Sequence, residues 1–443
     1  MTTAAEASPA ASKVPQLLLL LLLALAAFLQ LTVVSKTVVD HPLRADAGEY
    51  FSYAWNLRNH GVYSSARPTG EIGTPPAPDK VRSPGYPLFL LAVGNPEPSE
   101  QYLHRVSLVQ ALLGVGSVWL IYLIAASFLP RGLALVAGLL TALSPHLTMT
   151  SAYLLTEAPF TFLLLAGTLA TIRAASSLQL RTAALAGLLW GACALVRPTV
   201  QFLPLLFLLL AVALPALRRF RRPALVSLLV FCAVLAPWVI RNATVDQPGP
   251  SLMVNSVAHG AYPDFQFDNR PETFGFPYRF DPDYPAHIES PQALLAHLGD
   301  SFGSEPGRYA RWFLVGKPYF FLSLKNVQAL DIQIYPTPSN PYYERPLFAV
   351  IRDFAITAHW PLMVLGLLGV ALVASRVRGA PTIAGPTWLP AAIVALVVLY
   401  AIGLHMVVAP FPRYAIPFRP LIYALALVPI HALWSAVRGR QRA

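Results

Sequence analysis

Charged residues and cysteines are scarce in this chain of 443 residues. Asp, Glu, Lys and Arg make up 12% of it, about half the share that is usual in soluble domains, which excludes an ordinary soluble enzyme and a disordered chain. The two cysteines, Cys193 and Cys232, lie in apolar runs, so no disulfide framework is indicated. No HExxH or similar metal-binding spacing and no Walker motif occurs, and no GxGxxG or GxSxG follows a strand pattern. These absences argue against a zinc site, a nucleotide-driven pump and a hydrolase.

Long apolar runs dominate the chain instead. About 20 helical residues cross a bilayer core, and ten stretches approach that length. They are residues 14–34, 106–129, 132–150, 158–172, 182–196, 199–217, 223–240, 354–375, 386–408 and 415–436. No cleavage site follows the first run, which is therefore interpreted as an uncleaved helix. The sequence predicts an all-α polytopic membrane protein with about ten transmembrane helices, forming a single transmembrane domain over residues 1–443.

The basic residues are distributed unevenly over the connections between these stretches. With ten crossings, one side carries both termini and holds 13 of the 32 Lys and Arg residues against a single acid, Glu6. The other side holds the remaining 19 basic residues and 20 acids. The positive-inside rule then places both termini in the cytoplasm, together with the cluster RRFRR (218–222). The net charge of +11 is thus explained by topology in a multi-pass protein of the cell (inner) membrane, and nucleic acid is not expected as a partner.

Two long segments are predicted to lie outside the cytoplasm. Residues 35–105 follow the first helix and include an interfacial helix, and residues 241–353 are rich in Pro and aromatics and precede the C-terminal helices over 354–436. The apolar part 305–324 is interrupted by Gly, Lys and Pro and is expected to lie as a helix on the membrane surface. The stretches 158–172 and 182–196 are about 22 Å long as helices, and such short helices tend to line an indentation.

The first acids after the first helix are Asp46 and Glu49, in DAGEYFSYAWNLRNHG. Their spacing fits an N-cap and capping box at the start of a helix that carries Tyr50 and ends at Gly61. A structural role for the two acids is one reading. The other is a carboxylate held at the membrane surface as a general base.

Further ionisable residues are predicted at the outer edge of the membrane. Placing a charged side chain in a membrane segment costs free energy, so such residues are candidates for a functional role. Arg82 precedes a Pro-Gly turn, and either snorkels towards the headgroups or contacts a phosphate. Glu157 stands between two apolar stretches. Three more arginines, each preceded or followed by a proline at the end of a long apolar run, are read as interfacial anchors or as phosphate ligands: Arg197, Arg241 and Arg413. Together, such guanidinium and carboxylate groups suggest a phosphate-bearing ligand beside a basic catalyst, because the guanidinium fork donates two parallel hydrogen bonds.

Six pieces of the chain, in order, resemble those of the GT-C integral-membrane glycosyltransferases, in the family 39 branch of protein O-mannosyltransferases and aminoarabinose-type lipid A transferases. The pieces are DAGEYFSYAWNLRNHGVYS, RSPGYPLFL, ALSPHLTMTSAYLLTEAPF, GLLWGACALVRP, LAPWVIRN and FPRYAIPFRPLIYALAL, and they span residues 46 to about 427. The resemblance implies a GT-C-like fold. It also implies inverting transfer of a hexose or pentose from a polyprenyl-phosphate donor to an acceptor hydroxyl of a glycan, glycolipid or protein outside the cytoplasm.

The resemblance also implies roles for single residues. Asp46 matches the acid of the first loop that serves as catalytic base, with Glu49 beside it, and Glu157 matches the acid of the LLTE piece, associated with substrate or metal. Arg82 falls near a basic residue that contacts donor phosphate, although Ser83 here separates it from Pro84. Tyr50 is expected near the substrate. A divalent cation, Mg²⁺ or Mn²⁺, held by Asp46, Glu49 or Glu157 is compatible with the superfamily, although the sequence requires none.

The chemistry leads to the same reading without the resemblance. A lipid-phosphate sugar is already activated, so no nucleotide site is needed, and a carboxylate base contributes about 10²–10⁴-fold. The alternative function is a secondary transporter or a flippase for lipid-linked sugars, because short Pro-interrupted helices also mark transport sites. For a transporter we expect ionisable residues near the middle of several membrane spans. In this sequence the charged residues instead lie at the predicted outer edge of the membrane.

Overall fold

The computed structural model describes residues 9–68, 74–246, 252–324, 331–379 and 388–440, and these are almost entirely helical. The first half contains α1 (Pro9–Lys36), α2 (Ala45–His60), α3 (Gly85–Val93), α4 (Glu100–Ala126), α5 (Arg131–Ala142), α6 (Pro145–Met149), α7 (Glu157–Ser177), α8 (Leu180–Val196), α9 (Leu203–Ala213) and α10 (Arg221–Ala243). The second half contains α11 (Leu252–Ala261), α12 (Tyr284–His287), α13 (Pro291–Ser304), α14 (Pro306–Arg311), α15 (Lys317–Leu322), α16 (Pro341–Glu344), α17 (Pro346–Gly379), α18 (Trp388–Val407), α19 (Pro412–Ala415) and α20 (Arg419–Arg440). Within the described residues no β-strand forms, apart from one isolated bridge between Val38 and Ser339. The all-α prediction is confirmed.

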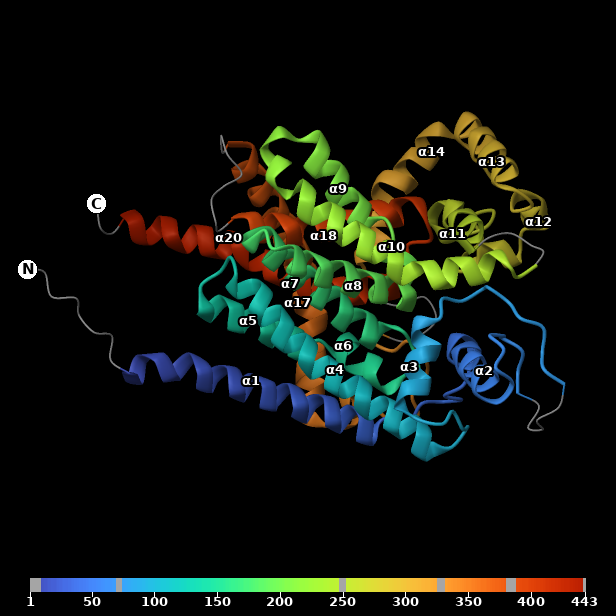
Figure 1. Cartoon of the computed structure of the whole chain (residues 1–443), viewed down its shortest axis with the longest axis horizontal. Coiled ribbons are helices and arrows are strands. Elements are labelled where there is room, and N and C mark those ends of the chain that lie inside the picture. The colour runs from blue at the N-terminus through green and yellow to red at the C-terminus, as the bar shows by residue number, and fades with distance from the viewer. Residues whose placement is uncertain (1–8, 69–73, 247–251, 325–330, 380–387, 441–443) are drawn as a thin grey trace, which may run out of the picture.

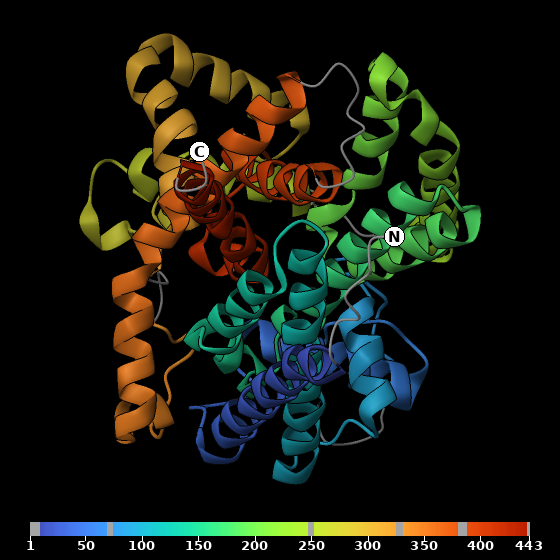
Figure 2. The ribbon, with the colours of Figure 1, turned by 90° about the vertical axis from the view of Figure 1, so that its left-hand side faces the viewer.

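Most of the long helices lie side by side along one direction (Figure 1), whereas the first part of α17, in orange, runs across it. The start of α1 and the end of α20 lie at the left of that view, while α2, α3 and α11 to α13 gather at the right. Seen end-on, the green segment with α9 and α10 lies at the rim of the bundle (Figure 2). This arrangement separates a bundle of apolar helices from a cap of shorter helices at one end.

Within the described residues, seven helical segments are long and apolar enough to cross a membrane, or eight if the bent pair α5–α6 counts as one span. All ten predicted stretches fall on helices, although the first two residues of 386–408 lie outside the described residues. The shorter apolar helices are α8 and the segment Pro198–Ala213. The expectation of a short helix at 158–172 was wrong, because α7 continues to Ser177. The count of ten crossings stays a prediction.

The predicted span 132–150 is broken rather than straight. Its two parts, α5 and α6, meet at an angle of 55°. Pro145 begins α6 after Leu143 and Ser144, and a proline at this point cannot continue the hydrogen bonding of the preceding helix. The break turns the chain towards the start of α7, where Glu157 is the first helical residue.

Two apolar cores hold the bundle and its cap together. The larger core is built from buried side chains of α4, α5, α7, α8, α18 and α20. The second lies under the cap and joins α1, α2, α3 and α4 through many tyrosines. Two of their hydroxyls form buried hydrogen bonds inside this core: Tyr86 donates to Gln110 at 2.9 Å and Tyr102 to the carbonyl of Leu90 at 2.9 Å. Buried hydrogen bonds of this kind fix the cap firmly on the bundle.

Candidate active site

Helix α2 begins one residue before the first predicted catalytic acid. Its N-cap is Arg44, which makes no side-chain capping bond, and Asp46 lies within the first turn. The predicted capping box of Asp46 and Glu49 was therefore wrong. The helix does end at Gly61, whose φ of 65° is left-handed, a conformation that glycine adopts at little cost. Since neither carboxylate is needed for capping, both are available for other contacts.

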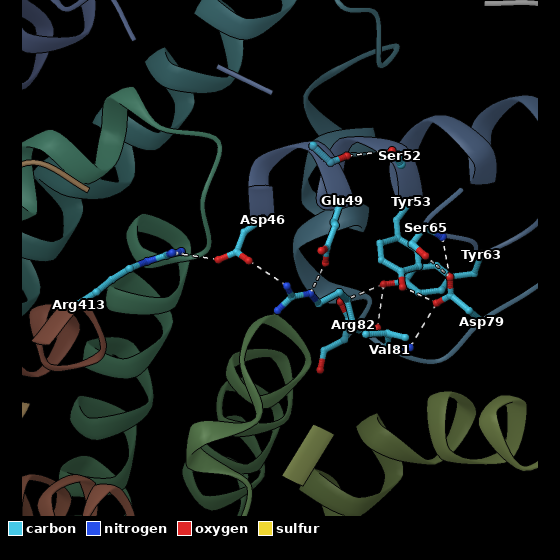
Figure 3. A network of polar contacts seen from close by, with 12 residues as sticks. Asp46, Glu49, Ser52, Tyr53, Tyr63, Ser65, Asp79, Val81, Arg82 and Arg413 are labelled. Carbon is cyan, nitrogen blue, oxygen red and sulfur yellow. Dashed lines mark hydrogen bonds and ion pairs between the residues drawn. The ribbon is translucent and has the colours of Figure 1, made fainter. Parts of the chain in front are cut away.

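Those carboxylates bind arginine side chains from distant parts of the chain (Figure 3). Arg82 donates from Nε to Oε2 of Glu49 at 2.7 Å and from Nη2 to Oδ1 of Asp46 at 2.8 Å. Arg413 donates from Nη1 to Oδ2 of Asp46 at 2.9 Å. Each oxygen of Asp46 thus accepts a charge-assisted hydrogen bond from a different guanidinium, which fixes the orientation of the carboxylate.

The chain of charges continues to the start of α7. Arg413 also donates from Nε to Oε1 of Glu157 at 2.5 Å, and Arg197 approaches the same oxygen at 3.4 Å. Glu157 is completely buried, whereas the side chains of Arg413 and Arg197 are each 15% exposed. The result is an unbroken alternation, Glu49–Arg82–Asp46–Arg413–Glu157–Arg197, which we call the charge relay row. It brings together six of the eight predicted site residues.

A close helix contact places two of these arginines at one site. Gly85, at the start of α3, presses against the end of α8, where an added Cβ would lie 2.5 Å from the backbone of Leu195 and Val196. Only a residue without a side chain allows this approach. Because Arg82 precedes α3 and Arg197 follows α8, the contact brings both arginines to the same end of the bundle.

The seventh predicted residue, Arg241, lies outside the charge relay row. It donates to the backbone carbonyls of Asp79 and, at 3.1 Å, Tyr63. The hydroxyl of Tyr63 in turn lies 3.0 Å from the carbonyl of Arg82. The Asp79 carboxylate accepts a hydrogen bond from Tyr53 and, at 2.6 Å, from the backbone of Ser65. Arg241 therefore clamps the loop that carries Arg82.

The eighth predicted residue, Tyr50, packs beside the row, with the guanidinium of Arg82 5.6 Å from the centre of its ring. Burial, with the nearby charge of Asp46, raises the pKa of Tyr50 to about 12. Burial by itself would also raise the pKa of Asp46, but Arg413 and Arg82 outweigh it and hold that pKa below the usual value. Asp46 is thus ionised at neutral pH, and Tyr50 remains a neutral hydrogen-bond donor.

Sequence reasoning did not single out two buried residues that, within the described ranges, carry unsatisfied side-chain atoms. Tyr335 is 4% exposed, stacks under the guanidinium of Arg44, and its hydroxyl has no hydrogen-bond partner in the described part of the chain. Arg419 is 1% exposed and donates from Nη2 to the carbonyl of Ser323 at 3.0 Å, while its Nε and Nη1 lack partners among the described residues. No local pattern singles out Tyr335 in a Pro-rich segment, whereas an arginine inside an apolar run is a signal that could have drawn attention to Arg419.

A divalent cation could bind at this site only through the carboxylates of the charge relay row. Asp46, Glu49 and Glu157 all face guanidinium groups, and among the described residues no group of three His, Cys, Asp or Glu side chains is placed to hold a metal ion. In this arrangement the residues do not fit Mg²⁺ or Mn²⁺, which take several oxygen ligands. The reaction derived below contains no step through a metal.

Residues 101–240 match the family model described as dolichyl-phosphate-mannose-protein mannosyltransferase. The whole fold is similar to the archaeal oligosaccharyltransferase AglB from Archaeoglobus fulgidus, in a complex with an inhibitory peptide and a dolichol-phosphate, at a TM-score of 0.52 and 14% identity over 96% of this chain and 51% of that one. A second structure of the oligosaccharyltransferase from this organism, tethered to an acceptor peptide with the NVT sequon, gives a TM-score of 0.51 and 12% identity over 94% and 50%. No curated protein matches the chain significantly.

These likenesses confirm the resemblance to GT-C membrane glycosyltransferases and the GT-C-like fold. The chain spans about half the length of the oligosaccharyltransferase structures it resembles. The match to the family model covers α4 to α10, which includes Glu157 and Arg197 but not Asp46, Arg82 or Arg413.

Proposed function

We propose that the chain is a glycosyltransferase of the GT-C type that moves a sugar from a polyprenyl-phosphate donor to an acceptor hydroxyl on the extracytoplasmic side of the membrane. The observation that carries the proposal is the charge relay row at one end of a bundle of membrane-type helices. The fold likeness to an oligosaccharyltransferase described with a dolichol-phosphate and a peptide supports a lipid-linked donor and a separate acceptor. The excess of basic residues at the opposite end supports cytoplasmic termini and an outward-facing site.

The arginines of the row differ in how much hydrogen-bonding capacity they keep for a ligand. Arg413 uses Nε, Nη1 and Nη2 on carboxylates, and so serves to position Asp46 and Glu157. Arg197 makes one long contact and stacks over Tyr414 at 4.4 Å, and Arg82 keeps Nη1 free of other partners in the described part of the chain. The donor phosphate is therefore assigned to Arg82, through its free Nη1, and to Arg197, whose charged donors suit the phosphate oxygens.

The remaining two assignments follow from the contacts of Arg241 and Glu157. Arg241 acts indirectly, by clamping the loop that holds Arg82. Glu157, fully buried between Arg413 and Arg197, positions both guanidinium groups and is shielded from the acceptor. In this role Glu157 acts on the two arginines and does not contact the sugar directly. Its place as the first residue of the membrane helix α7 fits such a buried position.

The proposed reaction is a single displacement. The acceptor oxygen forms a bond to the anomeric carbon while the bond from that carbon to the phosphate oxygen breaks, which inverts the anomeric centre. The acceptor proton passes to the carboxylate of Asp46, whose side chain is 31% exposed and so accessible; Glu49, at 44%, is the second candidate base. The polyprenyl phosphate that leaves gains negative charge, which Arg82 and Arg197 stabilise in a partly dry site.

Reconstituted protein tests this function directly. Vesicles containing the full chain are supplied with polyprenyl-phosphate donors carrying labelled hexoses or pentoses, together with cell-envelope glycan, glycolipid and peptide acceptors. We expect free polyprenyl phosphate and labelled acceptor to appear in equal amounts with one of these donors. Movement of intact donor across the bilayer, without release of lipid phosphate, would instead identify the protein as a transporter or flippase.

A further inference from the structure

An apolar cavity lies at the end of the bundle opposite to the candidate active site. It has a volume of about 110 Å³ and is enclosed by α7, α8, α9, α10 and α18. Its wall includes Ala174, Ala186, Phe207, Ala211, Ala224 and Ile393. Ala174 lies 17 residues after Glu157 along α7, which is about 26 Å of helix. The cavity is therefore separate from the charge relay row and has no part in the proposed reaction.

The size and lining of this cavity suit hydrocarbon. Its wall is formed almost entirely by small and aliphatic side chains, with Phe207 and Phe220 as the aromatic members. An apolar cavity of about 150 Å³ stays dry and accepts a benzene molecule, so this one has room for a short stretch of an alkyl chain. Moreover, α10 is the least covered of the spanning helices, with 11% of its apolar window buried inside the protein. Lipid chains therefore have access to this side of the bundle.

Four arginines flank, in sequence, two residues that line one end of the cavity, which we call its mouth. Leu217 and Phe220 belong to the cavity wall. The neighbouring positions are occupied by exposed arginines: Arg218 and Arg219 between these two residues, and Arg221 and Arg222 after them. Arg221 caps α9 by donating to the carbonyls of Ala211 and Val212. Among the described residues none of the four forms an ion pair with a carboxylate. The mouth thus offers three uncompensated positive charges next to an apolar cavity.

We infer that this end of the bundle is a binding site for an anionic phospholipid, with one acyl chain in the cavity and the headgroup phosphate on Arg218, Arg219 and Arg222. Charge complementarity selects the headgroup, because each basic residue near an anionic leaflet adds to the attraction. The cavity selects a chain rather than a protein segment, since it lies between helices at membrane depth, where exposed backbone polar groups are not tolerated. The site holds the rim helices α9 and α10 against α7, α8 and α18, and it does not depend on glycosyl transfer.

Photo-crosslinking tests this site with the full chain in phosphatidylcholine nanodiscs. The probe is a phosphatidylglycerol with a diazirine in one acyl chain, compared with a phosphatidylcholine that carries the same chain. We expect cross-links from the phosphatidylglycerol to map to the cavity walls on α7, α8, α9, α10 and α18, and to weaken at high salt because the headgroup contact is electrostatic. Replacing three arginines as R218Q/R219Q/R222Q should reduce this labelling about tenfold or more, while R218K/R219K/R222K should retain most of it.

Matched variants separate the site from a general effect of charge. R131Q/R438Q removes two exposed arginines from the same end of the bundle but away from the cavity, and should leave labelling unchanged. A224L fills the cavity and should reduce labelling by both lipids. Equal labelling by the two lipids, an equal loss in R131Q/R438Q, or unchanged labelling in R218Q/R219Q/R222Q would each overturn the proposal. Labelling by a polyprenyl chain regardless of its headgroup would assign the cavity to the tail of a donor instead, and would also overturn it.

Discussion

Arg413 binds Asp46 across 367 residues of sequence, through a contact of 2.9 Å between Nη1 and Oδ2. The two residues belong to the last and the first connections of the described helical bundle, so the site closes only when both ends of the chain are packed. The same guanidinium holds Glu157 at 2.5 Å. Arg413 is thus the central member of the charge relay row, and its loss should disturb both acids at once.

Asp46→Asn tests the proposed base. The amide keeps the size of the side chain but cannot take the acceptor proton, so sugar transfer should fall by about 10²–10⁴-fold, while donor binding to Arg82 and Arg197 persists. Single-turnover transfer assays with purified protein measure this loss. Asp40→Asn is the matched control, because Asp40 is also an acid after α1, but in the described residues its carboxylate pairs only with His41 and Arg44. Near wild-type turnover of Asp46→Asn would move the base to Glu49.

Plotted against pH, kcat/KM should fall on the acid side only at low pH. Burial opposes ionisation of Asp46, but Arg413 and Arg82 hold its pKa below the usual value. The carboxylate is therefore ionised across the neutral range, and both its base function and its contribution to stability are lost only as the pH falls through this lowered pKa. In Arg82→Gln one of the two nearest positive charges is gone, so the acid limb of kcat/KM should shift to higher pH. An unshifted limb would exclude Asp46 as the titrating base.

Arg413 and Glu157 should be strongly coupled in stability. Removing either partner leaves the other charge with a single remaining ion pair, Arg413 with Asp46 or Glu157 with Arg197, so the cost should stay below the roughly 3–5 kcal/mol of a fully unpaired buried charge. Arg413→Gln and Glu157→Gln should each lower the unfolding midpoint in detergent. The double variant should be less unstable than the sum of the two, with a coupling energy of about 0.5–3 kcal/mol. Additive effects would show that the 2.5 Å contact does not form in the membrane protein.

Arg197→Lys should weaken donor binding without harming the fold. The lysine keeps the charge but loses the planar fork and the stacking over Tyr414. Titration with polyprenyl phosphate measures the affinity, and the thermal midpoint checks the fold. Arg105→Lys is a suitable control, because Arg105 also stacks on a tyrosine, Tyr102, but lies on α4 outside the row. Equal donor affinity in Arg197→Lys and the wild type would favour simple anchoring at the interface.

Cysteine labelling tests the orientation in the membrane. Cys232 is exposed and Cys193 is buried, so both are first replaced by Ala. Position 220, in the arginine cluster, should then be protected from an impermeant maleimide in intact cells, whereas the exposed position 58 on α2 should react. Labelling at 220 in intact cells would reverse the proposed topology and place the charge relay row in the cytoplasm.

Much of the fold could be predicted from single stretches of the sequence. The apolar runs are long enough to require helices in a bilayer, because backbone polar groups must be satisfied within each segment. The structure differs from this prediction in the bounds of single helices. Pro145 breaks one predicted span into α5 and α6, and α7 extends beyond the apolar run to Ser177. Asp46 has the sequence position of a cap, but two arginines from elsewhere bind its carboxylate more strongly than a capping contact would.

Local sequence was enough to identify the candidate residues, since ionisable groups at the ends of apolar runs are costly and few. It could not determine which of them meet. Arg241 and Arg413 look alike in sequence, each preceded by a proline at the end of an apolar run, yet the first clamps a loop and the second joins two acids. That difference arises from tertiary packing alone. Gly85 lets α3 pack closely against α8, and the folded chain places α19, with Arg413, next to α2, with Asp46. Ion pairs act over a few ångströms, so only packing that fixes helices at that distance could decide the site.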